Sequence, residues 1–398
     1  MTRRLLKYGN RPIGYKGRGL KWVPSPSPSL PPFTIRLLFR DGVTPSFQYG
    51  EATQVSYSPN IWDLHYEGEW EAYAHSWDNL LYGQTDLLEV IAANSSGVDD
   101  MTAMFERCTS LHSVALFDTS SVLSFDVMFR RCSSLRSVPL FDTSSAVVLG
   151  GMFARCTALE SVPLFDTSSV TNMDSMFEQC TALRAVPLFD TSLVTSMGAM
   201  FNGCAALESV PLFDTSSVTN MSSMFARCTA LESVPLFDTS SVEDVHDMFN
   251  GCAALESVPL FDLSNVTTAR GMFELCTSLR NVPTFDLATA VDISRMFFLC
   301  GSLEEIALAN TGNITIISEA FRECTSLKQV PSLDSVSISN ANIAFAGCVN
   351  VESGALALYT QMASQATPPA YHERCFENCG SNTVTGAAEL AQIPSGWK

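Results

Sequence analysis

Apolar positions recur along this chain with a fixed period of 24 residues. The clearest unit runs from Cys156 to Gln179 and reads C-T-A-L-E-S-V-P-L-F-D-T-S-S-V-T-N-M-D-S-M-F-E-Q. A fixed period of this size is typical of a solenoid, in which one small unit stacks on the next. The same register carries a cysteine in eleven units: Cys108, Cys132, Cys156, Cys180, Cys204, Cys228, Cys252, Cys276, Cys300, Cys324 and Cys348.

The first half of each unit has the spacing of a strand. Leu159, Val162 and Leu164 form L-x-x-V-x-L, the strand signature of a leucine-rich repeat. Unbroken alternation in such a strand places Val162 and Leu164 inward, and Pro163 and Phe165 outward. Because proline donates no ladder hydrogen bond, the strand is expected to be only a few residues long.

The second half has the spacing of a helix. Residues 166–169, Asp-Thr-Ser-Ser, supply turn and cap chemistry. Met173, Met176, Phe177 and Cys180 then follow the i, i+3, i+4, i+7 pattern of one helical face. We therefore predict an α/β solenoid of the leucine-rich-repeat type, with a parallel short-strand sheet on one side and short helices on the other.

Composition changes outside the repeats, and this predicts four regions. Residues 1–32 form a basic tail with a Pro/Ser linker, and 33–83 a β-rich aromatic N-terminal cap. The solenoid covers 84–348, and 349–398 form a C-terminal cap with a helix at 355–363. Both ends of a solenoid need such caps, because each end exposes an apolar cross-section. Three tryptophans fall in the first cap: Trp62, Trp70 and Trp77.

The charge distribution bears on partners and location. The net charge is −18, yet the first 21 residues carry seven basic residues and no acid. The acidic body should repel nucleic acid and anionic membranes. No apolar run reaches the roughly 18 residues of a membrane span, and residues 8–12 interrupt any signal-peptide core. Residues 1–31 are expected to be a solvated tail or an attachment peptide that anchors the chain to a virion or surface; a nucleic-acid arm is the alternative.

The cysteine row has three interpretations. Single cysteines 24 residues apart do not form the close clusters that zinc requires, and parallel inward side chains do not turn toward one another as disulfides do. Buried free thiols, serving as small inward residues, are therefore favoured. Cys375 and Cys379 are the one close pair and a weak candidate for a disulfide.

Two further rows are candidates for binding. An aspartate row can cap turns or, alternatively, bind a cation such as calcium. A phenylalanine row beside it is the candidate exposed aromatic ladder, which would bind sugars or proteins if it faces outward; the alternative is that its rings pack together as a structural spine. The aspartates are Asp118, Asp142, Asp166, Asp190, Asp214, Asp238, Asp262 and Asp286. The phenylalanines are Phe117, Phe141, Phe165, Phe189, Phe213, Phe237, Phe261 and Phe285.

No pattern of catalytic residues stands out. The five histidines form no H-E-x-x-H, and neither G-x-S-x-G nor a phosphate loop occurs. We therefore predict a protein that is not an enzyme and uses no cofactor or metal.

The core F-D-T-S-x-V-T-x-M-x-x-M-F-x-x-C resembles the BspA-type leucine-rich repeats of bacterial surface proteins over about residues 84–348. The end of the chain, G-A-A-E-L-A-Q-I-P-S-G-W-K, is similar to repeat proteins of gut bacteria and their phages. The resemblance implies surface display and adhesion without catalysis. The predicted function is a recognition module on a cell surface or virion that binds a host-cell glycan or protein. The alternative is a structural spacer or decoration protein of a phage virion.

Overall fold

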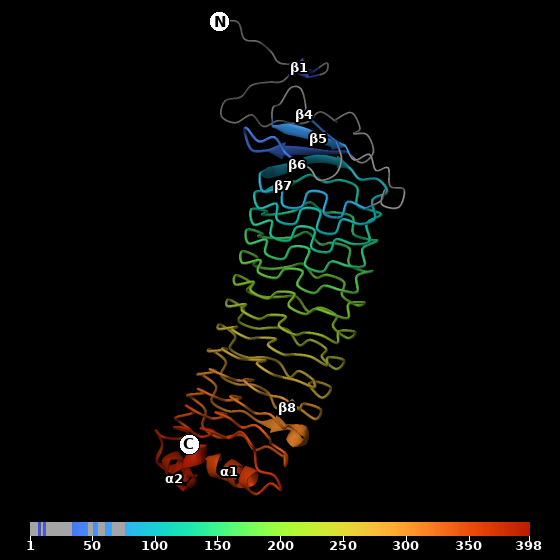
Figure 1. Cartoon of the computed structure of the whole chain (residues 1–398). Helices are drawn as coiled ribbons and strands as arrows, with labels where there is room; N and C mark the ends of the chain where they lie inside the picture. Colours follow the sequence, from blue (N-terminus) through green and yellow to red (C-terminus); the bar gives the residue numbers. More distant parts are fainter. Residues whose placement is uncertain (1–6, 9–10, 13–33, 47–50, 55–59, 66–75) are drawn as a thin grey trace.

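The computed structural model describes residues 7–8, 11–12, 34–46, 51–54, 60–65 and 76–398. These form a curved rod of stacked coils, with a small sheet at one end and two helices at the other (Figure 1). Apart from the two-residue strands β1 (Lys7–Tyr8) and β2 (Arg11–Pro12), the predicted anchor at 1–31 lies outside the described residues, as does Trp70.

The N-terminal sheet leads directly into the first coil. Its strand order is β4-β5-β3-β6-β7, antiparallel as far as β6 and parallel between β6 and β7. In β3, alternate apolar side chains are buried, as expected for a strand with one face on the core. The change from antiparallel to parallel pairing marks the start of the solenoid. The strands are β3 (Thr34–Phe39), β4 (Glu51–Gln54), β5 (Ile61–His65), β6 (Leu87–Asn94) and β7 (Ser113–Val114).

The predicted helices of the repeats are wrong: residues 76–354, all of which the structure describes, contain no α-helix. The segment with helical spacing instead folds as consecutive turns. Met176 N–H donates to Met173 O (3.2 Å) and Cys180 N–H to Phe177 O (3.0 Å), as in β-turns. Between these turns, Phe177 N–H donates to Met200 O of the next coil (2.9 Å). The apolar positions still face the core, but the backbone alternates between local and inter-coil hydrogen bonds.

Left-handed residues explain why this segment cannot be a helix. Ser175 and Gln179 have φ values of 56° and 57° and occupy the third position of two successive turns, as type II turns require. Equivalent residues in other coils share this conformation. A left-handed residue costs about 1 kcal/mol unless it is glycine, and the inter-coil hydrogen bonds offset that cost.

The continuous parallel ladder also lies on this turn side of the coil. Isolated bridges join Asn172 to Ser196 and Ser196 to Asn220, and the series extends from Ser76 to Tyr371. The predicted strand side has only short pieces in the described residues, among them β7 and the parallel pair β8 (Phe285–Asp286) and β9 (Leu308–Ala309). The sheet-like side of this solenoid is therefore the opposite of the predicted one.

Two rows of phenylalanine fill the thin core between the two sides. The ring of Phe153, on the turn side, lies 5.8 Å from that of Phe177 in the next coil. It also lies 6.1 Å from the ring of Phe165, on the other side of its own coil. Both contacts are nearly parallel stacks, which bury large apolar rings against one another. Stacked rings therefore tie each coil both to its neighbour and across its own width.

The C-terminal cap is helical. The helices are α1 (Ala355–Ala363) and α2 (Val384–Gln392), with the 3₁₀ segment η2 (Ser395–Trp397) beside them and η1 (Thr311–Asn313) inside the solenoid. Helix α1 matches the predicted one. Trp397 is buried under the ring of His372, 4.1 Å away, and closes the last coil. In the described part of the chain, no helix combines the length and the apolar character needed to span a bilayer.

Candidate binding surface

The candidate aromatic ladder is buried, so the prediction that it faces outward is wrong and the alternative of a structural spine is confirmed. Phe189 is 2% exposed, and its ring stacks on those of Phe165 and Phe177. The reason is a tight turn: Phe189 N–H donates to Pro187 O (3.0 Å), two residues back. This γ-turn shifts the strand alternation by one residue. The buried row is Phe117, Phe141, Phe165, Phe189, Phe213, Phe237, Phe261 and Phe285.

The same shift in alternation places a row of leucines in solvent, although Leu164 is predicted to point inward. The hydrogen bond that closes the γ-turn forms in two of these coils, from Phe141 N–H to Pro139 O and from Phe189 N–H to Pro187 O. Each of these side chains is 58% to 64% exposed. They occupy the same position in seven consecutive coils, next to a half-buried residue that is proline in six of them. The exposed row is Leu116, Leu140, Leu164, Leu188, Leu212, Leu236 and Leu260.

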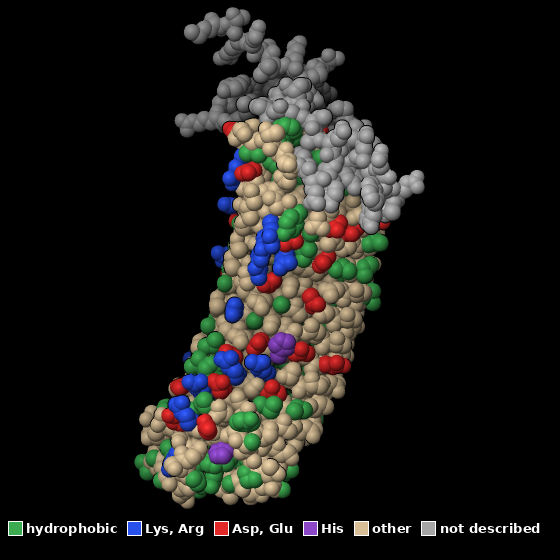
Figure 2. All heavy atoms as spheres, viewed as in Figure 1, with side chains coloured by type: hydrophobic (Ala, Val, Ile, Leu, Met, Phe, Trp, Pro, Cys, Tyr) green, Lys and Arg blue, Asp and Glu red, His purple; other side chains and the backbone are tan. Residues whose placement is uncertain are grey.

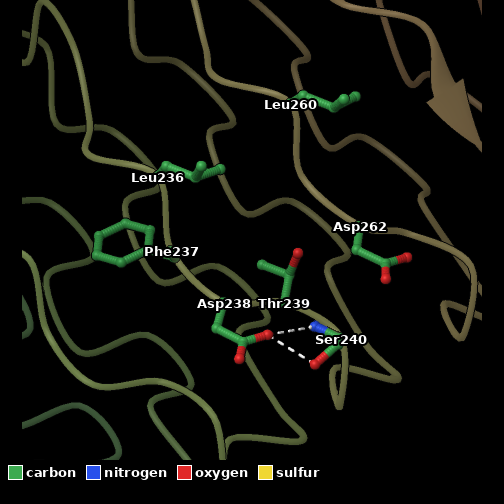
Figure 3. A pocket seen from close by; sticks show the side chains of 7 residues that line it. All are labelled: Leu236, Phe237, Asp238, Thr239, Ser240, Leu260 and Asp262. Carbon is green, nitrogen blue, oxygen red and sulfur yellow. Dashed lines mark hydrogen bonds between the residues drawn. The ribbon is translucent and has the colours of Figure 1, made fainter.

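Two residues further along each coil, the aspartates cap turns, as predicted. Asp238 Oδ1 accepts from Ser240 N–H (3.0 Å) and from Ser240 Oγ (2.6 Å), which Figure 3 shows. Both hydrogen bonds stabilise the ionised carboxylate, the one from the Ser240 hydroxyl more than the one from its N–H. They hold the pKa of the Asp238 carboxyl below its usual range. The pKa of Asp262 is lowered in the same way by Ser264. Both groups are therefore ionised at neutral pH.

The seven exposed leucines and the seven aspartates from Asp118 to Asp262 together form what we call the Leu–Asp surface. A groove of about 330 Å³ lies within it, between Leu236 and Leu260 and between Asp238 and Asp262 (Figure 3). No Lys or Arg occurs in the nine-residue stretch of any of the seven coils that carries this surface, from 113–121 to 257–265. Elsewhere, basic and acidic side chains are interspersed, as on the face shown in Figure 2.

A threonine row lies beneath the Leu–Asp surface and links the coils. Thr167 Oγ1 donates to Asp190 O of the next coil at 2.7 Å, and Thr215 Oγ1 to Asp238 O at the same distance. Thr239 is the last of this row before leucine replaces threonine at Leu263. Its hydroxyl is buried and has no hydrogen-bond partner among the described residues. The ladder of side-chain hydrogen bonds therefore ends at this coil.

The main chain of the Leu–Asp surface is less tightly joined than the turn side. Among the hydrogen bonds of the described residues, none involves the N–H of Leu212 or of Asp214. The rings of Phe165 and Phe189 on this side are 6.5 Å apart, against 5.7 Å for Phe177 and Phe201 on the turn side, although Phe117 and Phe141 at the N-terminal end of the row are 5.2 Å apart. Around Phe165 and Phe189 the coils therefore diverge toward the Leu–Asp surface.

All thirteen cysteines are free and buried, in agreement with the favoured interpretation; the weak candidate disulfide between Cys375 and Cys379 does not form. Each thiol of the row donates to a backbone oxygen, as from Cys204 Sγ to Phe177 O (3.0 Å). Burial raises the pKa of the Cys204 thiol to about 12, so it is not a nucleophile at neutral pH. In the described residues, no three His, Cys, Asp or Glu side chains converge as a metal site would require.

Comparison with known proteins gives a family for the repeats. The family described as "Mycoplasma protein of unknown function, DUF285" matches residues 78–186, 149–259, 184–282 and 256–357. No curated protein matches the chain. Among solved structures, a leucine-rich repeat protein of T. pallidum is 19% identical, with 61% of this chain and 72% of that one covered and a TM-score of 0.24. One from Eubacterium ventriosum is 15% identical, with 72% and 87% covered and a TM-score of 0.35.

Proposed function

This chain belongs to the family of Mycoplasma proteins of unknown function, DUF285, and we propose that it is a non-catalytic recognition module whose binding site is the Leu–Asp surface. The repeat architecture offers a long, regular face, which suits the binding of an extended partner.

The exposed leucine row carries this proposal. Soluble proteins rarely expose large contiguous apolar patches unless the patch binds something. Here the same large apolar side chain is held in solvent in seven successive coils, at 58% to 64% exposure, while the phenylalanine next to it is buried. The γ-turn that exposes Leu188 is closed by a backbone hydrogen bond, from Phe189 N–H to Pro187 O. Leu140 is held outward in the same way, by the hydrogen bond from Phe141 N–H to Pro139 O (3.0 Å).

We further propose that the module acts in adhesion on the surface of a bacterium or phage particle, with a host-cell glycan or protein as its partner. The resemblance of the repeats to bacterial surface proteins supports this setting. Residues 1–31 would then attach the solenoid to its carrier. Deleting them should abolish incorporation into a particle or cell envelope, measured by blotting purified particles; unchanged incorporation would refute the anchoring role.

Binding of the fluorescently labelled chain to host cells and to a glycan array tests the module itself. The variant Leu188→Ser/Leu212→Ser/Leu236→Ser should lose binding, because it removes three of the seven exposed leucines without touching the core. The control is Leu123→Ser/Val147→Ser, which removes exposed apolar side chains (51% and 40%) outside the stretches that carry the surface. If both variants bind like the unmodified chain, the Leu–Asp surface is not the site.

The alternative is an architectural spacer with no ligand of its own. The uniformity of the coils favours it: residues 154–170 recur unchanged at 226–242. Such copying changes the length of a rod without changing its cross-section. A spacer predicts no binding on any cell or array, and it predicts that deleting one 24-residue coil leaves the carrier's activity intact.

A further inference from the structure

We propose that the Leu–Asp surface, if it is the binding site proposed above, takes an extended strand of a partner protein in which apolar and basic residues alternate. The strand runs along the rod and crosses one coil with every two of its residues.

Charge complementarity selects a basic partner. Asp238 and Asp262 are ionised, since hydrogen bonds from Ser240 and Ser264 hold the pKa values of their carboxyl groups below the usual range. The seven stretches that form the surface contain no Lys or Arg to balance the aspartates. A second copy of this chain is a poor occupant, because each copy carries a net charge of −18.

The spacing of the coils selects a strand over a helix. The rings of Phe165 and Phe189, each next to a leucine and an aspartate of the surface, are 6.5 Å apart, whereas those of Phe117 and Phe141, at the N-terminal end of the row, are 5.2 Å apart. Side chains on one side of a β-strand repeat every ~6.6 Å, so a strand along the rod keeps register with the coils of Phe165 and Phe189. A helix repeats every ~5.4 Å and would slip by about 1 Å between these two coils.

The arrangement of the leucine and aspartate rows favours a partner strand in which apolar and basic residues alternate. In each coil the leucine and the aspartate are two residues apart and both are exposed. Figure 3 shows one such pair, Leu236 and Asp238, lining the groove. Successive side chains of a strand point to opposite sides. A strand lying between the two rows therefore directs one set of side chains over the leucines and the other over the aspartates. Apolar residues suit the first row, and Lys or Arg the second.

The main chain of the surface can add hydrogen bonds. In the described structure the N–H groups of Leu212 and Asp214 have no protein acceptor. A strand that crosses above them would bring main-chain carbonyl groups within reach of these N–H groups. A sugar or the surface of a helix does not present carbonyl groups at the spacing of the coils. Seven coils correspond to a strand of about 14 residues.

Two 14-residue peptides of identical composition, seven Lys and seven Leu, test the inference by fluorescence anisotropy on the full chain. One alternates the two residues; in the other, leucines recur every three or four positions and the peptide forms a helix. The alternating peptide should bind at least about tenfold more tightly, and its affinity should fall as salt rises. Equal binding of both peptides would overturn the strand. A glutamate–leucine alternating peptide should not bind.

Variants of the chain test the site. Asp190→Asn/Asp214→Asn/Asp238→Asn keeps an oxygen to cap each turn and should weaken the alternating peptide on the order of tenfold. The control Glu208→Gln/Glu232→Gln/Glu256→Gln removes the same charge from an exposed row outside the surface and should change binding less than about twofold. Equal losses in both variants would mean nonspecific attraction and would overturn the proposal.

The remaining outcomes separate this inference from the function on which it rests. Light scattering that shows self-association sensitive to the leucine variant would identify a second copy as the occupant and overturn the inference. If the leucine variant loses cell or array binding but no alternating peptide binds, the partner is not a strand while the recognition function stands. If the leucine variant keeps cell and array binding, the recognition surface itself is refuted.

Discussion

The two sides of each coil are joined to the next coil by different kinds of hydrogen bond. On the turn side, backbone N–H groups such as those of Ser175 and Phe177 donate to the next coil at 2.8 Å and 2.9 Å, and a parallel ladder runs through every coil. On the side that carries the Leu–Asp surface, threonine hydroxyls donate many of the hydrogen bonds between coils. Main-chain N–H groups such as that of Leu212 have no acceptor among the described residues. The difference indicates that the turn side stabilises the rod and leaves the Leu–Asp side available for binding.

Two neighbouring residues, one buried and one exposed, should show the largest difference in the unfolding free energy lost on substitution by alanine. Phe213→Ala removes a buried ring that lies 6.3 Å from the Phe201 ring and should cost about 3–5 kcal/mol of unfolding free energy. Leu212→Ala, one residue earlier, removes a side chain 58% exposed and should change stability by less than about 0.5 kcal/mol. Urea unfolding measures both. Similar costs would mean that the leucine row packs against the fold and is no free surface.

The threonine row offers a matched pair within the Leu–Asp side. Thr215→Val removes the hydrogen bond to Asp238 O (2.7 Å) and should cost about 1–2 kcal/mol. Thr239→Val removes a buried hydroxyl that has no partner among the described residues, so it should be neutral or slightly stabilising. The same unfolding measurement applies. Equal destabilisation by the two variants would show that Thr239 does form its inter-coil hydrogen bond in solution.

Most of the architecture was accessible from periodicity, because a 24-residue repeat leaves few alternatives to a stacked rod. Helix α1 was also predictable, since its apolar spacing is not interrupted by left-handed residues. The helices of the repeats were not, because Met173, Met176 and Phe177 show only which residues face the core. Consecutive type II turns bury the same positions, and their left-handed residues, Ser175 and Gln179, are not glycines that would reveal them.

The residues of the proposed binding surface were wrongly predicted because the strand alternation shifts by one residue. Counting from Val162 placed Leu164 inside. Counting back from Asp166, an ionised residue that must face water, places Phe165 and Thr167 inside and Leu164 outside, as the structure has them. The signal was therefore present in the sequence. The count from Val162 missed the shift in alternation at the proline, which in two coils is a local γ-turn such as that from Pro187 to Phe189.

Two glycines test the dependence of the turn side on left-handed residues. Gly251 has a φ of +75° and room for a methyl group, with the nearest atom 3.5 Å away. Gly251→Ala should therefore cost about 1 kcal/mol through backbone strain alone. Gly301 has similar room and no such φ, so Gly301→Ala should be neutral or stabilise by about 0.5 kcal/mol through the unfolded chain. Thermal unfolding distinguishes them, and equal effects would argue against the left-handed turns.

The smallest expected effect is the contribution of the Leu–Asp surface to stability in acid. Hydrogen bonds from Ser240 and Ser264 lower the pKa values of Asp238 and Asp262 in the folded chain. These carboxylates therefore contribute stability above their unfolded pKa, near 4, and lose it as the pH falls through the lower folded value. Because the groups are exposed, each contributes on the order of 0.3 kcal/mol. Ser240→Ala/Ser264→Ala should thus lower the urea midpoint slightly at pH 7 and narrow its gap from the unmodified chain at pH 3. A gap that stays constant with pH would show that these serines do not stabilise the ionised aspartates.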